Sequence, residues 1–364
     1  MKKVAIIMRG KTISGGGGAE RRFSRAINKM LQEKSDYAPY ILCNQKVIDE
    51  MLENKFIDDS ASKYLIPLEK FYSLNKFFSP RLLLKYLKNE NIHIIHFPLI
   101  QKSLIPLYLN LYLHKNIKVI ATIASAPISA KVKQDILTNI TLNLICFRAN
   151  IIDCLYDYFP KNYRRYSSKS RVTPCSFTNY KEFFPSEKEK IICFVGRLVE
   201  EKQPILIIEA FKKILDSNCG AEWKLYIIGD GPLKEMVMEK INKLNIENGV
   251  KCFSKPNVSS LINSSAIFVS IQKNENYPSQ SLLEAMASSN SIVATEVGNT
   301  RKILDDGCAL FIKSNSVDEL AEKLLILIEN NKVREELGKN AREKAIYTQS
   351  IEKFITYLSE LWSI

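Results

Sequence analysis

The chain has 364 residues, more than the roughly 250 to 300 at which a single hydrophobic core stops growing, so we expect two domains. With 46% hydrophobic and 25% charged residues, the composition excludes a disordered chain. The net charge of +13 lies wholly in the first half: residues 1–185 hold 29 Lys or Arg against 14 Asp or Glu, and residues 186–364 hold 23 against 25. A nucleic acid, an anionic membrane or a phosphorylated ligand would fit such a half, and so would an ordinary lysine-rich surface.

The cysteines and the apolar runs exclude further classes. Eight cysteines are scattered without a Cys-x-x-Cys pair or a nearby histidine, which argues against a metal site or redox motif. We expect reduced core thiols in a cytoplasmic protein. The apolar run after MKK is too short for a signal peptide, and the run at 104–113 is too short to span a bilayer, so we expect no membrane-spanning segment.

Short β-rich runs alternate with amphipathic stretches in chain order. In the first half, strands are predicted at VAIIM (4–8), PYILC (39–43), IHIIHF (92–97) and KVIATIA (118–124), with a glycine loop and helix after the first. The pattern restarts with IICFVG (191–196), a helix over 204–215, WKLYIIG (223–229), a helix from Leu233, and then VKCF, AIFVS and SIVAT. Strands that alternate with helices need crossover connections, so both halves are predicted to be parallel sheets of an α/β fold.

A break is predicted near residues 172–189, where two prolines, turn residues and a charged run precede the next strand. A final helix is predicted after Ala345, with Phe354, Tyr357 and Leu361 on one face.

The loop GRLVEEK (196–202) directly follows a predicted strand. Gly196 allows a tight exit from that strand, and Arg197 and Lys202 place two cations ahead of a helix N-terminus. Charge-assisted bonds and the helix dipole would act together on a diphosphate bound there. A solvated basic loop is the alternative.

The second motif is YPSQSLLEAMASSNSIVATEVGNT (277–300). Glu284 lies within a small apolar helix, and an unpaired buried carboxylate is costly, so we expect a defined hydrogen-bond partner for it. The two hydroxyls of a ribose would suit, because a carboxylate accepts from both. A pairing with a nearby lysine is the alternative.

These two motifs, with IIGDGPLKE (227–235) between them and VGNTRKIL after them, resemble the retaining glycosyltransferases of the GT-B fold, specifically glycosyltransferase family 4. GGGGAERR (15–22) is similar to the family's GG-x-ER loop, IIHFP (94–98) to its strand-His segment, and VTPCSFT (172–178) to its interdomain strand.

The resemblance implies two Rossmann-like domains facing a central cleft. They are expected at 1–175, for the acceptor, and at 189–345, for the nucleotide-sugar donor, with a helix at 346–364 that packs back on the first. It implies a UDP- or GDP-linked sugar donor, no metal, and retention of anomeric configuration. The expected catalytic residues are Arg197, Lys202, Glu275 and Asn276. The expected donor-binding residues are Gly196, Gly229, Gly231, Ser281, Leu282, Glu284 and Gly298, and the acceptor or phosphate loop comprises Gly16, Gly17, Gly18, Glu20 and His96.

Two positions depart from the family pattern. The first glutamate of its E-x(7)-E motif is replaced by Asn276, with Glu275 one residue earlier and expected on the opposite face of an extended chain. The family's T-x-H histidine is replaced by Ala124, which leaves His96 as the histidine placed to face the cleft. A core histidine at a strand end is the other interpretation.

Two segments of the first half, residues 70–88 and 161–171, mix aromatic and basic side chains. Such a mixture suits an anionic lipid interface and a lipid-linked saccharide acceptor at the inner face of the cytoplasmic membrane. The alternative for residues 81–88 is an amphipathic helix that covers the sheet.

We therefore expect a glycosyltransferase of surface polysaccharide biosynthesis. The alternatives are a non-catalytic protein that binds or scaffolds nucleotide sugars, a nucleotide-sugar epimerase, and, from charge alone, a nucleic-acid binder, for which no recognised motif is present.

If Asn276 positions the donor sugar, Asn276→Ala is expected to lower both donor hydrolysis and sugar transfer, because an amide hydrogen bond to a sugar hydroxyl is lost. Wild-type turnover of the variant in both assays would remove Asn276 from the site.

Overall fold

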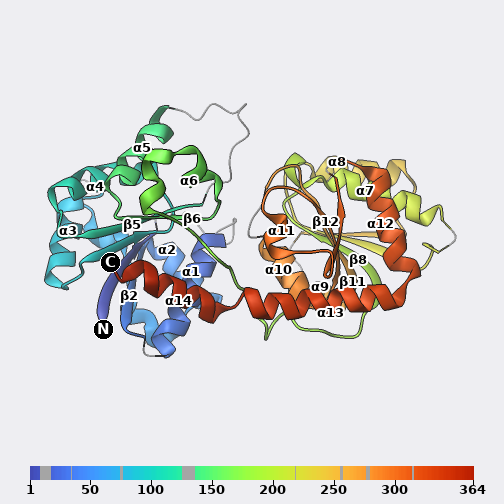
Figure 1. Ribbon diagram of the computed structural model, residues 1–364, viewed down its shortest axis with the longest axis horizontal. Coiled ribbons are helices and arrows are strands. Elements are labelled where there is room, and N and C mark those ends of the chain that lie inside the picture. Colours follow the sequence, from blue (N-terminus) through green and yellow to red (C-terminus); the bar gives the residue numbers. More distant parts are fainter. Residues whose placement is uncertain are drawn as a thin grey trace. The chain divides into compact units, whose positions relative to one another are not determined.

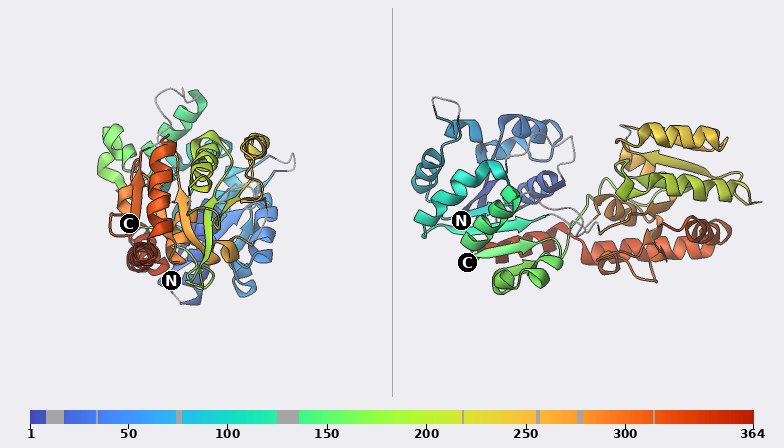
Figure 2. Two further views of the ribbon diagram at one scale, coloured as in Figure 1. Left: turned by 90° about the vertical axis from the view of Figure 1, so that its right-hand side faces the viewer. Right: turned by 90° about the horizontal axis from the view of Figure 1, so that it is seen from above.

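The structure is a computed structural model that describes residues 1–8, 18–33, 35–73, 77–124, 136–217, 219–254, 257–275, 279–313 and 315–364. It divides into two compact units. Unit 1 comprises residues 1–174 and 351–364, and unit 2 comprises residues 175–350. Within each unit, helices cover both faces of a parallel sheet (Figures 1 and 2).

In the described part of unit 1 the sheet has seven strands in the order β3-β2-β1-β4-β5-β6-β7. Their bounds are β1 (Lys2–Ile7), β2 (Tyr37–Cys43), β3 (Leu65–Pro67), β4 (Ile94–Phe97), β5 (Lys118–Ile123), β6 (Ile151–Cys154) and β7 (Ser170–Val172). The helices are α1 (Gly18–Gln32), α2 (Gln45–Glu53), α3 (Pro80–Asn89), α4 (Ile105–Asn110), α5 (Ile136–Arg148), α6 (Tyr158–Asn162) and α14 (Ile351–Trp362), with short 3₁₀ turns η4 (Leu111–Leu113) and η5 (Arg164–Lys169).

In the described part of unit 2 the sheet has six strands in the order β10-β9-β8-β11-β12-β13. Their bounds are β8 (Glu189–Val195), β9 (Lys224–Ile228), β10 (Val250–Phe253), β11 (Ser265–Ser270), β12 (Ser291–Thr295) and β13 (Ala309–Ile312). The helices are α7 (Pro204–Leu215), α8 (Lys234–Lys243), α9 (Val258–Ser264), α10 (Gln280–Ala287), α11 (Thr300–Ile303), α12 (Val317–Glu329) and α13 (Asn331–Thr348), with a 3₁₀ turn η6 (Glu200–Lys202).

The two sheets confirm the predicted α/β fold with two Rossmann-like parallel sheets. In each, the first strand of the unit is central and the chain first builds outward on one side and then on the other. In unit 2, α7, α8 and α12 pack with one another and lie across the sheet from α9, α10 and α13 (Figure 1). The inner strands are therefore buried on both faces, which explains their continuous apolar sequences.

The final helical region differs from the single helix predicted after Ala345. The long helix α13 ends at Thr348, and α14 begins at Ile351. Gln349 lies between them, 2% exposed, with its side-chain oxygen accepting from the Ser176 main-chain N–H at 2.8 Å and its carbonyl accepting from the Tyr180 hydroxyl at 3.0 Å. These tertiary bonds interrupt the helix, and no local sequence signal marks them.

A buried carboxylate ties α14 into unit 1. Asp153 on β6 accepts hydrogen bonds from Thr122 Oγ1 (2.8 Å), Thr173 Oγ1 (2.7 Å) and Tyr357 Oη of α14 (2.6 Å). Three donors satisfy a charge that would otherwise be costly to bury. Burial and the adjacent Asp153 raise the pKa of Tyr357, so its hydroxyl stays a donor.

Tyr357→Phe is expected to destabilise unit 1 by about 1.5 to 3 kcal/mol, because one donor to a buried carboxylate is removed. The two tryptophans make this measurable: Trp223 lies in unit 2 and Trp362 in unit 1. In a Trp223→Phe background, Trp362 fluorescence during urea unfolding reports unit 1. Tyr158→Phe, at a 42% exposed tyrosine of α6, is the matched control, and equal destabilisation by both variants would contradict the proposed role of Tyr357.

Candidate functional site

The predicted site residues of unit 2 follow four neighbouring strands. The sheet order β9, β8, β11, β12 puts the loops after these strands side by side at the carboxyl edge. The strand order reverses between β8 and β11, because the chain runs from β8 outward to β10 before β11 pairs with the other side of β8. In open parallel sheets, ligands bind outside the carboxyl ends of strands at such a reversal.

Glycines bring the loops after β8 and β9 into main-chain contact. A Cβ at Gly229 would lie 1.9 Å from the Gly196 carbonyl oxygen, and one at Gly231 would lie 2.5 Å from the Leu198 carbonyl oxygen. Main-chain bonds join the same loops: Gly196 N to Ile228 O at 3.0 Å and Leu198 N to Asp230 O at 2.9 Å. No side chain fits between these loops, so glycine is required at both positions.

Lys202 joins the loop after β8 to the loop after β11. Its Nζ donates to Gln272 Oε1 at 2.9 Å, across the point where the strand order reverses. Gln272 is held in turn by its main-chain N–H, which donates to Thr295 Oγ1 at the end of β12 (3.1 Å). Burial lowers the pKa of Lys202 to about 8, because the charged form loses hydration. Lys202 therefore stays charged at neutral pH and would gain from an anionic ligand.

Arg197 lies on the same loop with its side chain exposed, five residues before Lys202. The two predicted cations therefore differ: one is accessible to solvent, and the other is partly buried and held by an amide.

The next residues of the edge, Glu275 and Gly298, form a close contact. Glu275 Oε1 accepts from the main-chain N–H of Asn299 at 2.9 Å. Gly298 has φ +52°, and a Cβ there would lie 2.5 Å from Glu275 Cβ. Gly298 therefore supplies both the left-handed turn and the room for the glutamate. Asn276, its neighbour in the predicted catalytic set, lies outside the described residues.

Helix α10 begins beside this edge. Ser281 Oγ donates to the carbonyl oxygen of Val195, the last residue of β8, at 3.2 Å. Leu282 is 3% exposed and packs in the core, so its side chain anchors the helix. Glu284 is half-buried, and its Oε1 accepts from Gln280 Nε2 at 3.2 Å. Glu284 thus accepts a hydrogen bond from a glutamine on its own helix, and its role toward a ribose stays a prediction.

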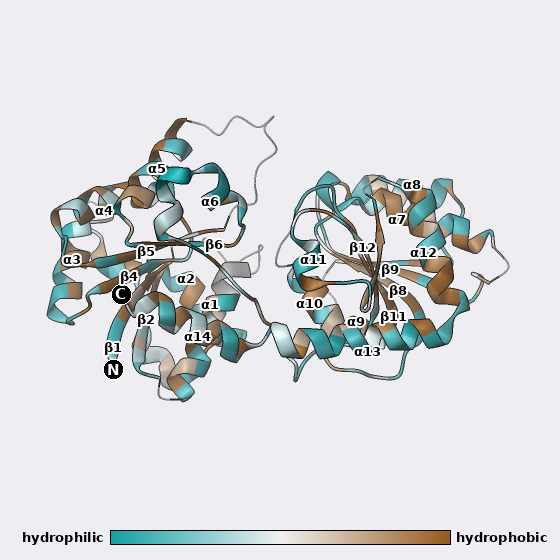
Figure 3. Ribbon diagram, viewed as in Figure 1, coloured by the Kyte–Doolittle hydropathy of each residue, from teal (hydrophilic) through white to brown (hydrophobic). Residues whose placement is uncertain are grey.

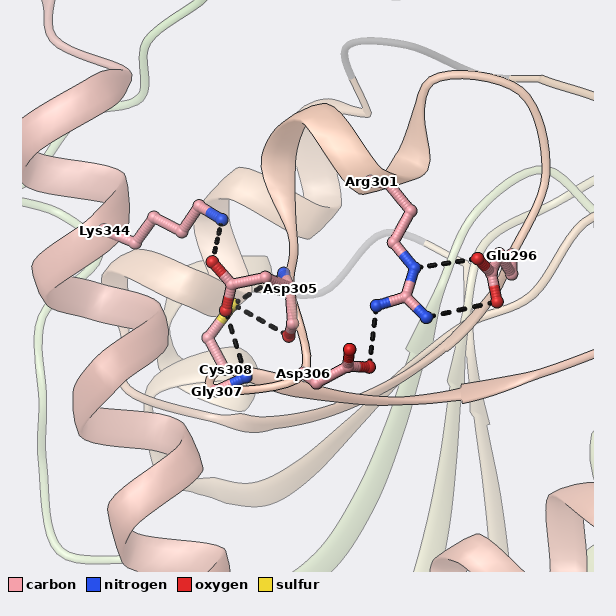
Figure 4. Close-up of polar contacts among 7 residues, drawn as sticks. All are labelled: Glu296, Arg301, Asp305, Asp306, Gly307, Cys308 and Lys344. Carbon is pink, nitrogen blue, oxygen red and sulfur yellow. Dashed lines mark hydrogen bonds and ion pairs between the residues drawn. The ribbon is translucent and has the colours of Figure 1, made fainter.

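Beyond β12, another basic side chain is already neutralised. Arg301 of α11 donates to Glu296 from Nε (2.8 Å) and Nη2 (3.2 Å), and to Asp306 from Nη1 (2.6 Å), as Figure 4 shows. Lys344 of α13 forms an ion pair with Asp305 in the same region (Figure 4). These pairs fix the loop after β12, so Arg301 differs from the predicted cations Arg197 and Lys202 in having two carboxylate partners.

The predicted acceptor loop is described only in part. Gly16 and Gly17 lie outside the described residues, Gly18 is the first residue of α1, and Glu20 is on the first turn of that helix, with its side chain outside the description.

His96 requires a correction. It is fully buried, and both ring nitrogens are used: Trp362 Nε1 donates to Nδ1 at 3.1 Å, and Nε2 lies 2.8 Å from Thr122 Oγ1. Because Nδ1 accepts and Thr122 donates to Asp153, the proton lies on Nε2. Burial lowers the pKa of His96 to about 3. His96 is therefore a neutral core residue, and its assignment to the acceptor site is wrong.

Sequence reasoning missed Gln272 and Thr295. The available signal was position: each polar residue ends or closely follows a buried apolar strand, where parallel-sheet ligand sites form. Within the described residues, no group of three or more His, Cys, Asp or Glu side chains is arranged to hold a metal ion.

A cavity of about 350 Å³ lies at the opposite, amino edge of the unit 2 sheet. Its lining includes Glu189 at the start of β8, Ser291 at the start of β12, and Arg334 of α13. The Arg334 guanidinium donates to the carbonyl oxygen of Leu327 and holds α12 against α13. The cavity is therefore separate from the candidate site.

The sequence of unit 2 matches a known family. The family model described as glycosyl transferases group 1 matches residues 176–344, which lie within unit 2 and make up slightly less than half of the chain.

Two curated relatives illustrate the sequence similarity. An uncharacterized glycosyltransferase of Methanocaldococcus jannaschii is 31% identical over 155 residues, or 41% of each chain. A Campylobacter jejuni enzyme is 27% identical over 198 residues, or 53% of each chain, and its name describes an α-1,4-N-acetyl-D-galactosaminyltransferase acting on a saccharide-diphospho-undecaprenol. The chain spans 34% to 53% of the length of the first curated relatives it matches.

A solved structure matches the whole chain. The Anabaena protein HepE, crystallised with UDP, has a TM-score of 0.78 and 16% identity, with all of both chains covered. Unit 2 is thus similar in sequence to group 1 glycosyl transferases, and the two Rossmann-like units together have the GT-B fold of glycosyltransferases.

Proposed function

We propose that the protein is a retaining glycosyltransferase that moves a sugar from a nucleoside-diphospho-sugar to a saccharide or lipid-linked saccharide acceptor. The observation that carries the proposal is the Lys202–Gln272 contact, which places a partly buried ammonium at the strand-order reversal of unit 2. Matches to a glycosyl transferase family model and to named glycosyltransferases support the reaction class.

The role proposed for Arg197 and Lys202 is to bind the diphosphate and stabilise it as it leaves. Negative charge on the leaving diphosphate grows in the transition state, so a cation already in place accelerates departure. Lys202 is suited to this because burial has weakened its hydration, and an anion would replace the lost solvation. We propose that these two side chains perform this task without a metal ion.

The role proposed for Glu284 is to accept hydrogen bonds from the ribose hydroxyls. Its carboxylate now accepts from Gln280, one turn earlier on α10, and a carboxylate has further lone pairs for a ribose. Gly196, Gly229, Gly231, Ser281, Leu282 and Gly298 would shape the surrounding main chain. Uridine is the first base to test, because the Anabaena protein of the same fold was crystallised with UDP.

Glu275 is proposed to position the Gly298 turn. Its carboxylate already accepts the Asn299 N–H, and it lies next to Asn276, the proposed contact to the donor sugar. We therefore propose that Glu275, expected from the sequence to be catalytic, acts as a positioning residue rather than as a direct substitute for the family's missing glutamate.

A lipid-linked acceptor in surface polysaccharide synthesis is proposed for unit 1. The Campylobacter relative has an undecaprenol-linked acceptor in its name, and the positive charge of this chain lies in its first half. The Gly16–Gly18 loop and Glu20 are the residues proposed to meet the acceptor or a phosphate oxygen. Within the described residues, no helix meets the length and hydropathy needed to cross a bilayer.

The test is a panel of UDP- and GDP-sugars, assayed for binding, hydrolysis and transfer to lipid-linked saccharides. Glu284→Gln is expected to raise the Kd of the best donor about tenfold or more, since a charge-assisted bond to the ribose is weakened. Glu239→Gln, at an exposed glutamate of α8, is the matched control and should leave the Kd unchanged.

The panel also separates the alternatives. Donor binding with neither hydrolysis nor transfer would favour a non-catalytic binding protein, and an isomerised nucleotide sugar formed without acceptor would favour an epimerase. Failure of every donor to bind would refute the proposed function.

Donor affinity is expected to fall as the pH rises through about 8, where Lys202 loses its proton. One unit above that pKa about a tenth of the lysines remain charged, so the Kd for a nucleotide sugar should be about tenfold higher at pH 9 than at pH 7. The diphosphate of a nucleotide sugar does not itself titrate in this range. Titration calorimetry across the range measures the effect.

Lys202→Arg should flatten this pH profile, because a guanidinium stays charged, and Lys202→Met should weaken binding at pH 7 and remove the pH dependence. An unchanged profile in Lys202→Met would show that another group causes the dependence.

A further inference from the structure

Helix α5 of unit 1 carries apolar side chains on its exposed face as well as on its buried face. Ile136, Ile140 and Phe147 are 79%, 52% and 71% exposed, and their spacing places them on one side of the helix. Thr141 and Ile145, on the opposite side, are buried against the sheet. A helix that only covers a sheet would show polar residues to solvent, so this outward stripe needs another explanation.

The neighbouring turn extends the stripe. Tyr112 of η4 stacks on Phe147 with ring centroids 6.4 Å apart, and its hydroxyl donates to the Leu144 carbonyl at 2.7 Å. Leu113, next in the chain, is 81% exposed, and Leu109, one turn before Tyr112, is 53% exposed. We name the six exposed residues Leu109, Leu113, Ile136, Leu137, Ile140 and Phe147 the apolar stripe. Figure 3 colours α4 and the first turn of α5 as hydrophobic.

The chain around the stripe is strongly basic. Residues 101–171 contain eleven Lys or Arg and three Asp, an excess of eight positive charges. One acid, Asp153, is buried in the core network, and another, Asp157, pairs with Lys161. Tyr166 Oη donates to Asn143 of α5 at 3.0 Å and so attaches η5, which begins with the exposed Arg164 and Arg165, to the helix.

The segment at 70–88, the other membrane candidate from the sequence, fits less well. Phe71, Leu83, Leu84 and Leu87 are buried in the unit 1 core, so α3 is an amphipathic helix that covers the sheet. Phe77 and Leu82 of this segment are 75% and 43% exposed, but only Leu82 lies on α3, whereas α5 carries four exposed apolar side chains.

We propose that the apolar stripe and the basic residues of η5 dock unit 1 on an anionic lipid bilayer. Outward isoleucine, leucine and phenylalanine side chains would enter the boundary between headgroups and acyl chains, while Arg164 and Arg165 meet lipid phosphates. A surface that attracts anions through charge alone would not need exposed apolar residues. A surface that binds a protein partner would not need the local excess of eight positive charges. A bilayer with anionic lipids accounts for both features. The proposal deepens, and rests on, the lipid-linked acceptor proposed above.

The experiment is co-sedimentation of the full chain with vesicles of phosphatidylcholine alone or with about 30% phosphatidylglycerol. Neither donor nor acceptor is present, so failure to bind would refute docking without bearing on sugar transfer. Wild-type protein is expected to bind anionic vesicles, and binding should weaken at high salt.

Two double variants separate the contribution of the apolar side chains from that of the arginines. Ile140→Ser/Phe147→Ser should reduce partitioning onto anionic vesicles about tenfold or more, and Arg164→Glu/Arg165→Glu should remove the preference for anionic over neutral vesicles. Met236→Ser/Met238→Ser, at exposed methionines of α8 in unit 2, is the matched control and should bind like wild type. Equal loss in the control would overturn the assignment of the stripe.

Light scattering of the same proteins tests the rival occupant, a second copy of the chain. If wild type is a dimer and Ile140→Ser/Phe147→Ser is a monomer that still binds vesicles like wild type, the stripe is a self-association surface and the proposal is refuted. A monomeric wild type that loses vesicle binding through the stripe variant supports it. Each variant is expected to have the circular dichroism spectrum and melting temperature of the wild type. This result shows that the substitutions change the surface and not the fold.

Discussion

The main-chain contact between the loops after β8 and β9 is the constraint on which the candidate site depends. With Gly229 against the Gly196 carbonyl, two neighbouring strands end at one level, and the chain after β8 is directed along the edge toward Gln272. Main-chain bonds at Gly196 and Leu198 hold the loop from which Lys202 reaches that glutamine. The positions of the cations are therefore influenced by glycines and main-chain carbonyl groups as well as by the charged side chains themselves.

Charge at this edge is distributed unevenly, and the distribution supports a diphosphate site. Arg301 is satisfied by Glu296 and Asp306, while the Lys202 ammonium donates to the uncharged amide of Gln272 and has a pKa lowered by burial. A partly buried cation with a neutral partner is costly in the absence of an anion and favourable in its presence. The buried carboxylate of Asp153 in unit 1 differs from Lys202, because three hydrogen-bond donors already surround it.

The sequence predicted what is local and missed what depends on distant partners. Strand β12 and helix α7 have the predicted bounds, because their apolar runs end at clear turn residues. Strands β3, β6, β7 and β13 were not predicted, because a run of three or four residues gives only a weak periodic signal, although β4 and β10, of four residues, were predicted. His96 was misassigned because its partner Trp362 lies 266 residues away, and the break at Gln349 depends likewise on Ser176. Placing Arg197, Lys202 and Glu284 at one sheet edge required the spacing of known relatives, since periodicity alone cannot bring loops together.

The sheet edge in unit 2 is complete within a single unit: its strands, its glycines and the Lys202–Gln272 bridge all fall between residues 175 and 350. Changes to the surface of unit 1 therefore leave these contacts intact. Under the proposed function, one nucleotide-sugar module of this construction can be inherited beside first units that diverge freely, so new acceptors can be acquired without rebuilding the module that binds the donor.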